Sequence, residues 1–135
     1  MKHTKKIISI LVIGLIVFWL IWSEYKNRHL RTHFTITTGH ITGITGTSYK
    51  NNNRSVLYDY EVDGKLLHGE NNLAPCVKTD SQGLRLLLVN QEFPVAYDTD
   101  NFQKSDIILR QREAALYNYQ IPPSRQYIDS VLSCK

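Results

Sequence analysis

An uncharged apolar run of sixteen residues near the N-terminus constrains this chain more than any other feature. Ile7 to Trp22 reads IISILVIGLIVFWLIW, and only Ser9 and Gly14 depart from bulky apolar character. An α-helix over this run is about 24 Å long, slightly shorter than the ~30 Å hydrocarbon layer of a bilayer. Flanking lysines and the aromatic residues at its C-terminal end extend the helix to both interfaces. The run therefore predicts a transmembrane helix over about residues 5–25.

A cleaved secretory signal is the alternative, because it also has a basic start and an apolar centre. Here the apolar run is followed by Ser23-Glu24-Tyr25-Lys26, which offers no pair of small residues to a signal peptidase. No cysteine lies directly after the run either, so a lipoprotein cleavage site is absent there. The sequence favours an uncleaved anchor over residues 1–28, followed by one small domain over residues 29–135.

The distribution of charge agrees with this division. The chain has 135 residues and a formal net charge of +4. Residues 1–28 hold five basic side chains and one acidic side chain, whereas residues 29–135 hold eleven of each. A nucleic-acid-binding domain would carry its positive charge on the folded part, so the charge distribution argues against that class. The surplus cations instead indicate a lipid bilayer as the partner of the N-terminal segment.

The orientation of the anchor follows less directly from charge. Three basic residues lie within six residues of the N-terminus, and three lie within ten residues after the run. The numbers of basic residues on the two sides are equal, so the positive-inside rule favours neither orientation. A tail of six residues before the apolar run is typical of a signal anchor, whose C-terminal part is translocated. We therefore expect a single-pass protein of the bacterial inner membrane, with the N-terminus inside and the domain extracytoplasmic.

The clearest signal within the domain lies at residues 56–65, which read VLYDYEVDGK. Valine and tyrosine alternate with mostly acidic residues, which predicts a strand with one buried face. The Asp63-Gly64 pair that follows is preferred in two-residue hairpin turns because glycine tolerates a positive φ. A turn at this pair predicts a hairpin in which Asp59 lies opposite His68 on the polar face.

Two further strands are predicted on either side of this hairpin. Residues 35–47 are rich in β-branched side chains, and a bulge near Gly39 would bring Ile36 and Ile41 to one face. Residues 93–97 predict a strand that has Pro94 at a sheet edge or near the strand start. An exposed edge there would make Phe93, Val95 and Tyr97 an interaction surface.

The remaining residues predict short helices and one short strand. A capping box with Thr79 as the N-cap favours a helix over about residues 80–89, although the apolar run 84–89 also fits a strand. Residues 107–109 predict a strand, residues 112–119 a weak helix, and residues after Pro122-Pro123 an amphipathic helix. The predicted fold class is α+β: one transmembrane helix, then a small, mostly antiparallel β-rich domain with two or three short helices.

Catalytic and metal-binding patterns are largely absent from the sequence. It contains no nucleophile elbow, no phosphate-binding glycine loop and no His-Glu-x-x-His pair. The stretch from Asp98 to Asn101 begins like a calcium loop, but Phe102 and Leu109 occupy positions that need oxygen ligands. Asp59 with His68 could form a general base, but no nucleophile is identifiable beside them. We therefore predict no enzyme activity, no cofactor, no catalytic residue and no metal ligand.

The two cysteines, Cys76 and Cys134, leave two alternatives open. In an oxidising compartment they can form a disulfide, which would stabilise the fold by about 4 kcal/mol in the chain-entropy model. In the cytosol both remain thiols.

The order of motifs resembles short bacterial membrane-anchored proteins that carry a β-rich domain of unknown function. The similar features are the Gly39-His40-Ile41 strand, the hairpin from Tyr58 to Lys65 and the Phe93–Tyr97 strand. The resemblance covers most of residues 35–110. It implies the fold and the bacterial envelope, and it implies no catalytic or binding residue.

These observations predict a non-enzymatic protein that displays a small domain for protein–protein interaction. It would act as an immunity protein or an envelope accessory factor, with the bilayer and another protein as partners and no small-molecule substrate. The alternative is a small-molecule or metal-ion sensor at the membrane surface. Its ligands would be His29, His33 and His40, which follow the apolar run, or the loop from Asp98 to Asp100.

Overall fold

The computed structural model describes residues 2–46, 54–73, 77 and 79–133, except for the side chains of residues 2–10 and 26–28. The chain divides into two units, Met1–Thr32 and His33–Lys135. The first unit consists of helix α1, Lys2–Thr32. The sequence suggested a boundary after residue 28. The boundary lies after Thr32 instead, because α1 continues through four further residues.

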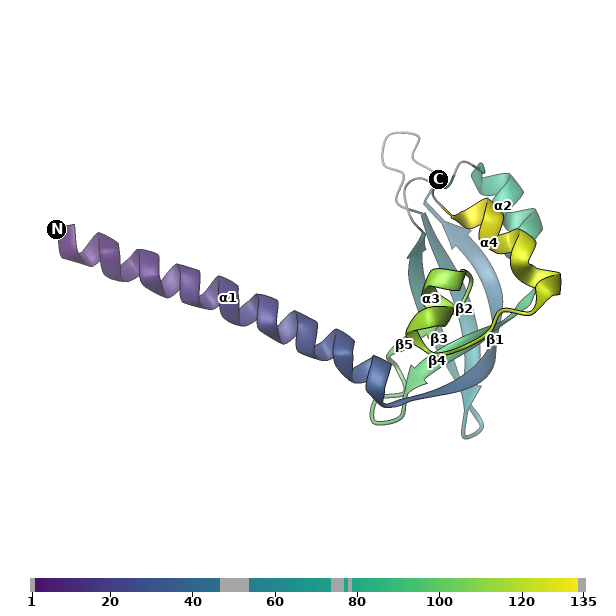
Figure 1. Cartoon of the computed structure of the whole chain (residues 1–135), viewed down its shortest axis with the longest axis horizontal. Helices are drawn as coiled ribbons and strands as arrows, with labels where there is room; N and C mark the ends of the chain where they lie inside the picture. The colour runs from purple at the N-terminus through teal and green to yellow at the C-terminus, as the bar shows by residue number, and fades with distance from the viewer. Residues whose placement is uncertain (1, 47–53, 74–76, 78, 134–135) are drawn as a thin grey trace. The chain divides into compact units, whose positions relative to one another are not determined.

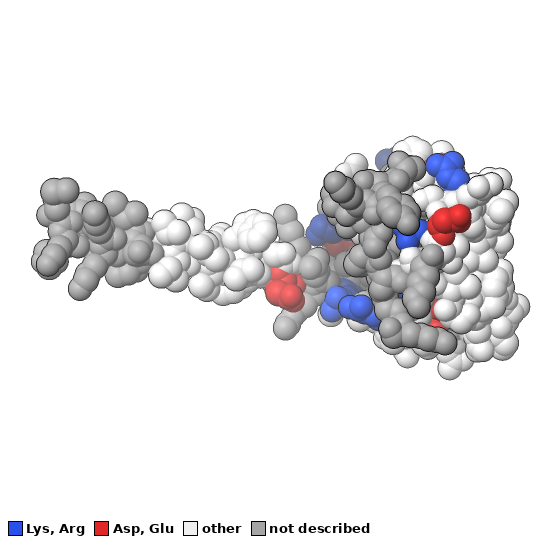
Figure 2. All heavy atoms as spheres, turned by 90° about the horizontal axis from the view of Figure 1, so that it is seen from above, with Lys and Arg blue, Asp and Glu red and all other residues white. Residues whose placement is uncertain are grey.

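Helix α1 exposes its apolar side chains on every side. Each described residue from 11 to 25 is exposed, and the large apolar ones among them are 48–69% accessible. Figure 2 shows the described stretch before Glu24 as uncharged white spheres, with Glu24 in red at its end. Among the helices whose residues are described, none is sufficiently long and apolar to cross a membrane. The predicted run Ile7–Trp22 begins at residues 7–10, whose side chains lie outside the described part.

The second unit is built on one antiparallel sheet that curls upon itself (Figure 1). Its strand order is β3-β2-β1-β4-β5. The strands are β1 Phe34–Thr45, β2 Arg54–Val62, β3 Lys65–Leu73, β4 Glu92–Asp98 and β5 Ser105–Ile107. This arrangement confirms the α+β class and the mostly antiparallel, β-rich domain.

The β2–β3 hairpin forms in the predicted register. Asp63 and Gly64 both have a positive φ, 51° and 74°, as a type I′ turn requires. Val62 pairs with Lys65, and Asp59 pairs with His68. The alternate residues of β2 are buried as the pattern indicated, and Tyr58 and Tyr60 are each 1% exposed.

The bulge in β1 lies further along the strand than predicted. The register with β2 shifts between Ile41 and Gly43, not near Gly39. Regular alternation therefore continues from Ile36 to Ile41 and places these two side chains on opposite faces of the sheet. The bulge after Ile41 then places Ile44 on the same buried face as Ile41. Gly39 has a separate role, because its missing side chain leaves room for Val95 of β4.

Short helices complete the domain. They are α2 Ser81–Leu88, α3 Gln111–Leu116, the 3₁₀ helix η1 Pro123–Arg125 and α4 Gln126–Leu132. The N-cap of α2 is Asp80 and not Thr79, because the Asp80 carboxylate accepts a 2.6 Å hydrogen bond from Gly83 N–H. Leucine and isoleucine side chains of α2 and α4 join the sheet residues in one core. The fully buried helix residues in it are Leu84, Leu88, Ile128 and Leu132.

The predicted interaction edge at Phe93, Val95 and Tyr97 is wrong. Strand β4 lies inside the sheet, paired with β1 on one side and with β5 on the other. Phe93 and Val95 are 2% and 0% exposed. Pro94 lies near the strand start, which was the other possibility. The backbone nitrogen and carbonyl of Pro94 face the end of β5. The carbonyl oxygen accepts a hydrogen bond from Ile108 N–H at 2.8 Å, and no N–H donor is needed from Pro94 in return.

Candidate functional site

The described part of the domain has one long free sheet edge, the first half of β3. Val62 and Lys65 close a two-residue turn and so form a hydrogen-bonded pair, after which hydrogen-bonded and non-hydrogen-bonded pairs alternate. This alternation directs the backbone N–H and C=O groups of Leu66, His68 and Glu70 away from β2. No described backbone group pairs with them. The other edge strand, β5, is only three residues long.

A row of four polar side chains crosses the solvent-facing side of the sheet. His68 of β3 lies opposite Asp59 of β2, Asp59 lies opposite His40 of β1, and His40 lies opposite Glu92 of β4. Residues that lie directly opposite each other project from the same face. The row therefore alternates histidine and carboxylate across four neighbouring strands.

Two close pairs make up this row. His68 Nδ1 lies 2.6 Å from Asp59 Oδ1, and His40 Nε2 lies 3.5 Å from Glu92 Oε1. Both pairs occupy non-hydrogen-bonded ladder positions, where side chains approach most closely. The sequence predicted the first pair but not the second. The side chain of His68 is 75% exposed and that of His40 is 59% exposed, so both are accessible from solvent.

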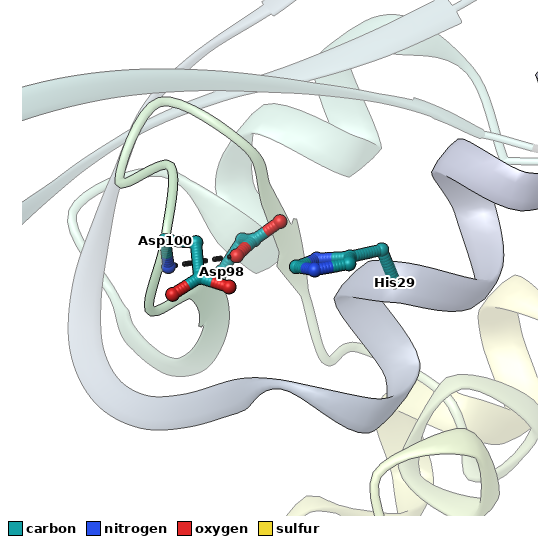
Figure 3. A group of neighbouring side chains, drawn as sticks. All are labelled: His29, Asp98 and Asp100. Carbon is teal, nitrogen blue, oxygen red and sulfur yellow. Dashed lines mark hydrogen bonds between the residues drawn. The ribbon is translucent and has the colours of Figure 1, made fainter.

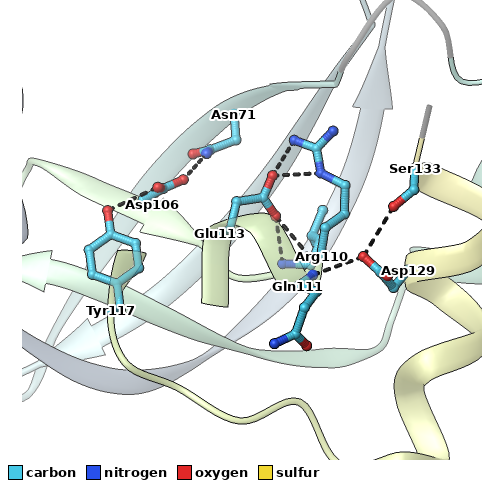
Figure 4. Close-up of polar contacts among 9 residues, drawn as sticks. Asn71, Asp106, Arg110, Gln111, Glu113, Tyr117, Asp129 and Ser133 are labelled. Atoms are coloured by element: carbon cyan, nitrogen blue, oxygen red, sulfur yellow. Dashed lines mark hydrogen bonds and ion pairs between the residues drawn. The ribbon is translucent and has the colours of Figure 1, made fainter. Parts of the chain in front are cut away.

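The seam where the curled sheet brings β3 near β5 is polar (Figure 4). The Asp106 carboxylate accepts a 2.9 Å hydrogen bond from the Tyr117 hydroxyl and another from the Asn71 amide. The hydroxyl of Tyr58 donates to Asn71 Oδ1 at 2.9 Å and lies 3.0 Å from Ser105 Oγ. These contacts join β2, β3, β5 and the end of α3.

Burial controls the acidity of this seam. It raises the pKa of Tyr58 well above its usual value and also raises the pKa of Asp106. The hydrogen bonds that Tyr117 and Asn71 donate act in the opposite direction on Asp106, because they favour the carboxylate. Among the described residues, no buried side-chain polar atom lacks a hydrogen-bond partner. The seam contacts therefore serve to close the sheet.

A second polar cluster in Figure 4 fixes the C-terminal helices. The Glu113 carboxylate accepts hydrogen bonds from Arg110 and from the backbone N–H of Leu109, and so caps the start of α3. Asp129 of α4 accepts a 2.8 Å hydrogen bond from Gln111 N–H. These carboxylates are used in holding α3 and α4 in place.

The loop after β4, which begins at Asp98, is a hydrogen-bonded turn. Asp98 is 1% exposed, and its carboxylate accepts a 2.9 Å hydrogen bond from Asp100 N–H (Figure 3). The Lys104 ammonium lies 3.8 Å from the same carboxylate. Asn101 Oδ1 accepts from Gln103 N–H at 3.3 Å. These contacts hold the acidic stretch in a turn.

The segment between α3 and α4 passes β1 and β4 (Figure 1). A hollow of about 400 Å³ lies between residues of this segment and of the two strands. Ile36, on the face opposite the core residue Ile41, forms part of its wall with Tyr119. The Arg125 guanidinium lies 5.1 Å from the centre of the Phe93 ring. Ile36 points away from the core, and residues of the segment between α3 and α4 lie beside it, so its side chain is partly buried.

The histidines predicted to gather do not all lie together. His33 precedes β1 and His40 lies near the middle of that strand, so their backbones are roughly 20 Å apart along an extended chain. His40 instead lies in the row with His68. The two residues are far apart in the sequence, so the sequence did not predict that they lie in one row. Cys76 and Cys134 lie outside the described residues.

Comparisons of the chain with protein-family models, with curated proteins and with solved structures found no match. No relative therefore supplies a function, a partner or a site residue.

Proposed function

We propose that this chain is a membrane-tethered, non-enzymatic binding domain. Helix α1 anchors the chain in a lipid bilayer, and the domain after Thr32 presents the free edge of β3 to a partner protein. The observation that carries the tether is the uncharged apolar surface of α1, exposed around the whole helix from residue 11 to residue 22. A helix that is apolar all round needs an apolar environment.

The tether is tested by extraction of membranes at alkaline pH. We expect the wild-type chain to stay with the membrane. A double variant, Val12→Lys with Ile16→Lys, should be released, because each lysine near the centre of the bilayer costs about 3 kcal/mol. The matched control is Val12→Ala with Ile16→Ala, which should remain membrane-bound. Release of the wild type, or a mature chain that begins after Trp22, would show an export signal instead.

We further propose that the membrane is the bacterial inner membrane, with the domain outside the cytoplasm. The resemblance to short bacterial anchored proteins and the short N-terminal tail support this orientation. An impermeant maleimide applied to intact cells tests it through Cys76 and Cys134. Labelling of both thiols only after reduction would support an extracytoplasmic domain with a disulfide. Labelling only after cell lysis would place the domain in the cytosol.

The partner surface is the edge of β3, where the outward backbone groups of Leu66, His68 and Glu70 can pair with an extended segment. The exposed Leu66 side chain, 62% accessible, adds an apolar contact at this edge. Such a partner could be a toxin that the domain neutralises or a component of an envelope complex.

Site-specific photocrosslinking in living cells tests this surface. A crosslinking residue at Leu66 should capture a reproducible protein, whereas the same residue at Leu86 should not. Leu86 is the matched control because it is 80% exposed but lies on α2. Replacing Glu70 with proline, in a chain that carries the crosslinker at Leu66, removes one outward donor and should abolish capture. Equal capture from both positions, or none from Leu66, would contradict the proposal.

A further inference from the structure

Two exposed glutamates lie beside the free edge of β3. Glu70 belongs to β3 itself, and Glu61 of β2 lies opposite Leu66 of β3. Glu70 follows His68 by two residues and Glu61 follows Asp59 by two residues, so both glutamates project from the solvent-facing side of the sheet. Within the described residues, neither glutamate takes part in an ion pair. A cation that reaches this edge therefore meets two carboxylates that no described cation neutralises.

The described strands place no lysine or arginine on this face. Their basic residues of these two types are Arg54 and Lys65. Arg54 lies opposite Leu73 and Lys65 lies opposite Val62, and both of these partners are core residues. Residues that lie opposite each other project from the same face, so Arg54 and Lys65 belong to the other side of the sheet. The local field at the solvent-facing side of the edge therefore favours a positively charged segment.

From the juxtaposition of outward backbone groups and these two carboxylates, we propose that the segment that pairs with β3 is basic. It is an extended stretch of another protein with Lys or Arg opposite Leu66 and opposite Glu70. The inference rests on the proposed function, because it concerns the partner of the same edge. An antiparallel strand, the more stable pairing, forms hydrogen-bonded pairs with Leu66, His68 and Glu70. Its two basic residues are therefore four positions apart, with one residue between them opposite His68.

The two basic side chains have different contacts. The one opposite Glu70 forms a direct cross-strand ion pair, because side chains at opposite positions begin about 5 Å apart. The one opposite Leu66 lies two strand spacings, roughly 10 Å, from the backbone of Glu61, and the two long side chains together span this distance. Its aliphatic stem covers Leu66, which is 62% exposed, while its charged end reaches Glu61. An apolar contact and an ion pair are thus made by one residue.

The same charges disfavour a second copy of this chain at the edge. Two β3 edges that pair in antiparallel fashion place their solvent-facing sides on one continuous surface. Glu61 and Glu70 of both copies would then gather on that surface, with no lysine or arginine of the described strands among them. Like charges brought together at an interface oppose association. A basic segment therefore fits the edge better than the chain's own copy.

The test measures the binding of three fluorescent peptides to the full chain in micelles of an uncharged detergent, by fluorescence anisotropy. The first peptide carries two lysines four residues apart among threonines and valines. The second has its lysines three residues apart, so that they face opposite sides of a strand, and the third has glutamines in place of both lysines. Because each exposed cross-strand ion pair contributes about threefold, the first should bind about threefold more tightly than the second and roughly tenfold more tightly than the third. Salt at roughly 0.5 M should reduce both ratios, because it screens exposed charges.

Variants of the chain locate the contact. Glu61→Gln and Glu70→Gln should each lower the affinity for the first peptide about threefold and leave that for the glutamine peptide unchanged. Glu92→Gln is the matched control, since this exposed carboxylate lies on the same face but three strands from β3. That distance of roughly 14 Å exceeds the Debye length of about 10 Å, so the affinity should not change. Glu70→Pro removes an outward backbone donor and should abolish binding of every peptide, while all four variants keep the wild-type melting temperature.

The outcomes separate the charge of the partner from the edge itself. Equal binding of the three peptides, abolished by Glu70→Pro, would overturn the basic partner and leave the proposed edge in place. Binding of no peptide, with a protein still captured by the crosslinker at Leu66, would have the same meaning. Loss of capture at Leu66 would overturn the proposed function as well. A dimer in analytical ultracentrifugation that Glu70→Pro dissociates would show that the occupant is a second copy, against the inference.

Discussion

Replacing Gly39 with alanine should destabilise the domain, because the core leaves no space for a side chain there. Gly39 lies in β1 between Tyr60 of β2 and Phe93 of β4. A Cβ atom at this position would lie 2.5 Å from Val95 Cγ2 and 3.0 Å from the Asp59 carbonyl oxygen. Val95 is completely buried, and the Asp59 carbonyl belongs to the sheet backbone, so neither group moves away without disturbing the core.

The size of the effect follows from two opposing contributions. Overpacking a close-packed core costs about 1–3 kcal/mol, and the short contact with Val95 places Gly39→Ala at the upper end of that range. Alanine recovers about 0.5–1 kcal/mol because glycine loses more backbone entropy on folding. The net expected loss is roughly 2 kcal/mol, which lowers the melting temperature by about 8–16 °C for a domain of this size.

Gly43→Ala is the matched control on the same strand. A Cβ atom there would lie 3.8 Å from Leu57 Cδ1, an ordinary van der Waals contact. This variant should be as stable as the wild type or slightly more stable. Both tryptophans lie in α1, so unfolding is followed by the near-ultraviolet circular dichroism of the buried tyrosines. If Gly39→Ala melted within 2 °C of Gly43→Ala, the close approach of Gly39 and Val95 would be refuted.

Three smaller changes test the seam and the hairpin by the same melting assay. Tyr58→Phe should cost about 1–2 kcal/mol, because Asn71 and Ser105 lose a buried partner; an unchanged melting temperature would contradict the seam. Burial raises the pKa of Asp106 in the folded chain, so between its unfolded and folded pKa values the folded state binds more protons and stability falls as pH rises. Asp106→Asn should remove that decrease, which begins near pH ~4, and parallel pH profiles would argue against it. Gly64→Ala should cost about 1 kcal/mol because φ is positive there, and a neutral effect would exclude the type I′ turn.

The β2–β3 hairpin could be predicted because all its information is local. Alternating apolar residues define the buried face, the Asp63-Gly64 pair defines the turn, and the turn length then sets every cross-strand pair. The Asp59–His68 contact followed from that register alone. Helix α2 was predicted for the same reason, and its N-cap was misplaced by one residue because Thr79 and Asp80 both have capping side chains.

Strand β4 shows why the rest could not be predicted in this way. Whether a strand lies at an edge depends on which other strands reach it, and β5 comes from a three-residue segment with little pattern of its own. Pro94 suggested an edge because it lacks an N–H group. In the folded domain that missing group faces the end of β5, where Ile108 donates a hydrogen bond and none is needed in return.

The row of His68, Asp59, His40 and Glu92 depends on a similar long-range feature, the position of the β1 bulge. His40 pairs with Asp59 before the bulge, and Gly43 pairs with Leu57 after it. Ile44 follows Ile41 by three residues, so only a bulge between them allows both to be buried while His40 stays in line with Asp59. Bulges leave no reliable mark in a glycine-rich strand, so sequence alone placed it three residues too early.

Deleting Thr42 tests that argument directly, because the deletion removes the unpaired residue of the bulge. Ile41 and Ile44 are then two residues apart, so regular alternation keeps both on the buried face and keeps His40 in line with Asp59. We therefore expect the deletion variant to melt close to the wild type. Thr42→Ala, the matched control, keeps the bulge and should also be stable, since only an exposed hydroxyl that contacts the Leu57 carbonyl at 3.3 Å is lost. A loss of about 2 kcal/mol or more in the deletion variant, the cost of exposing Ile44, would show that Thr42 is not the extra residue of the strand.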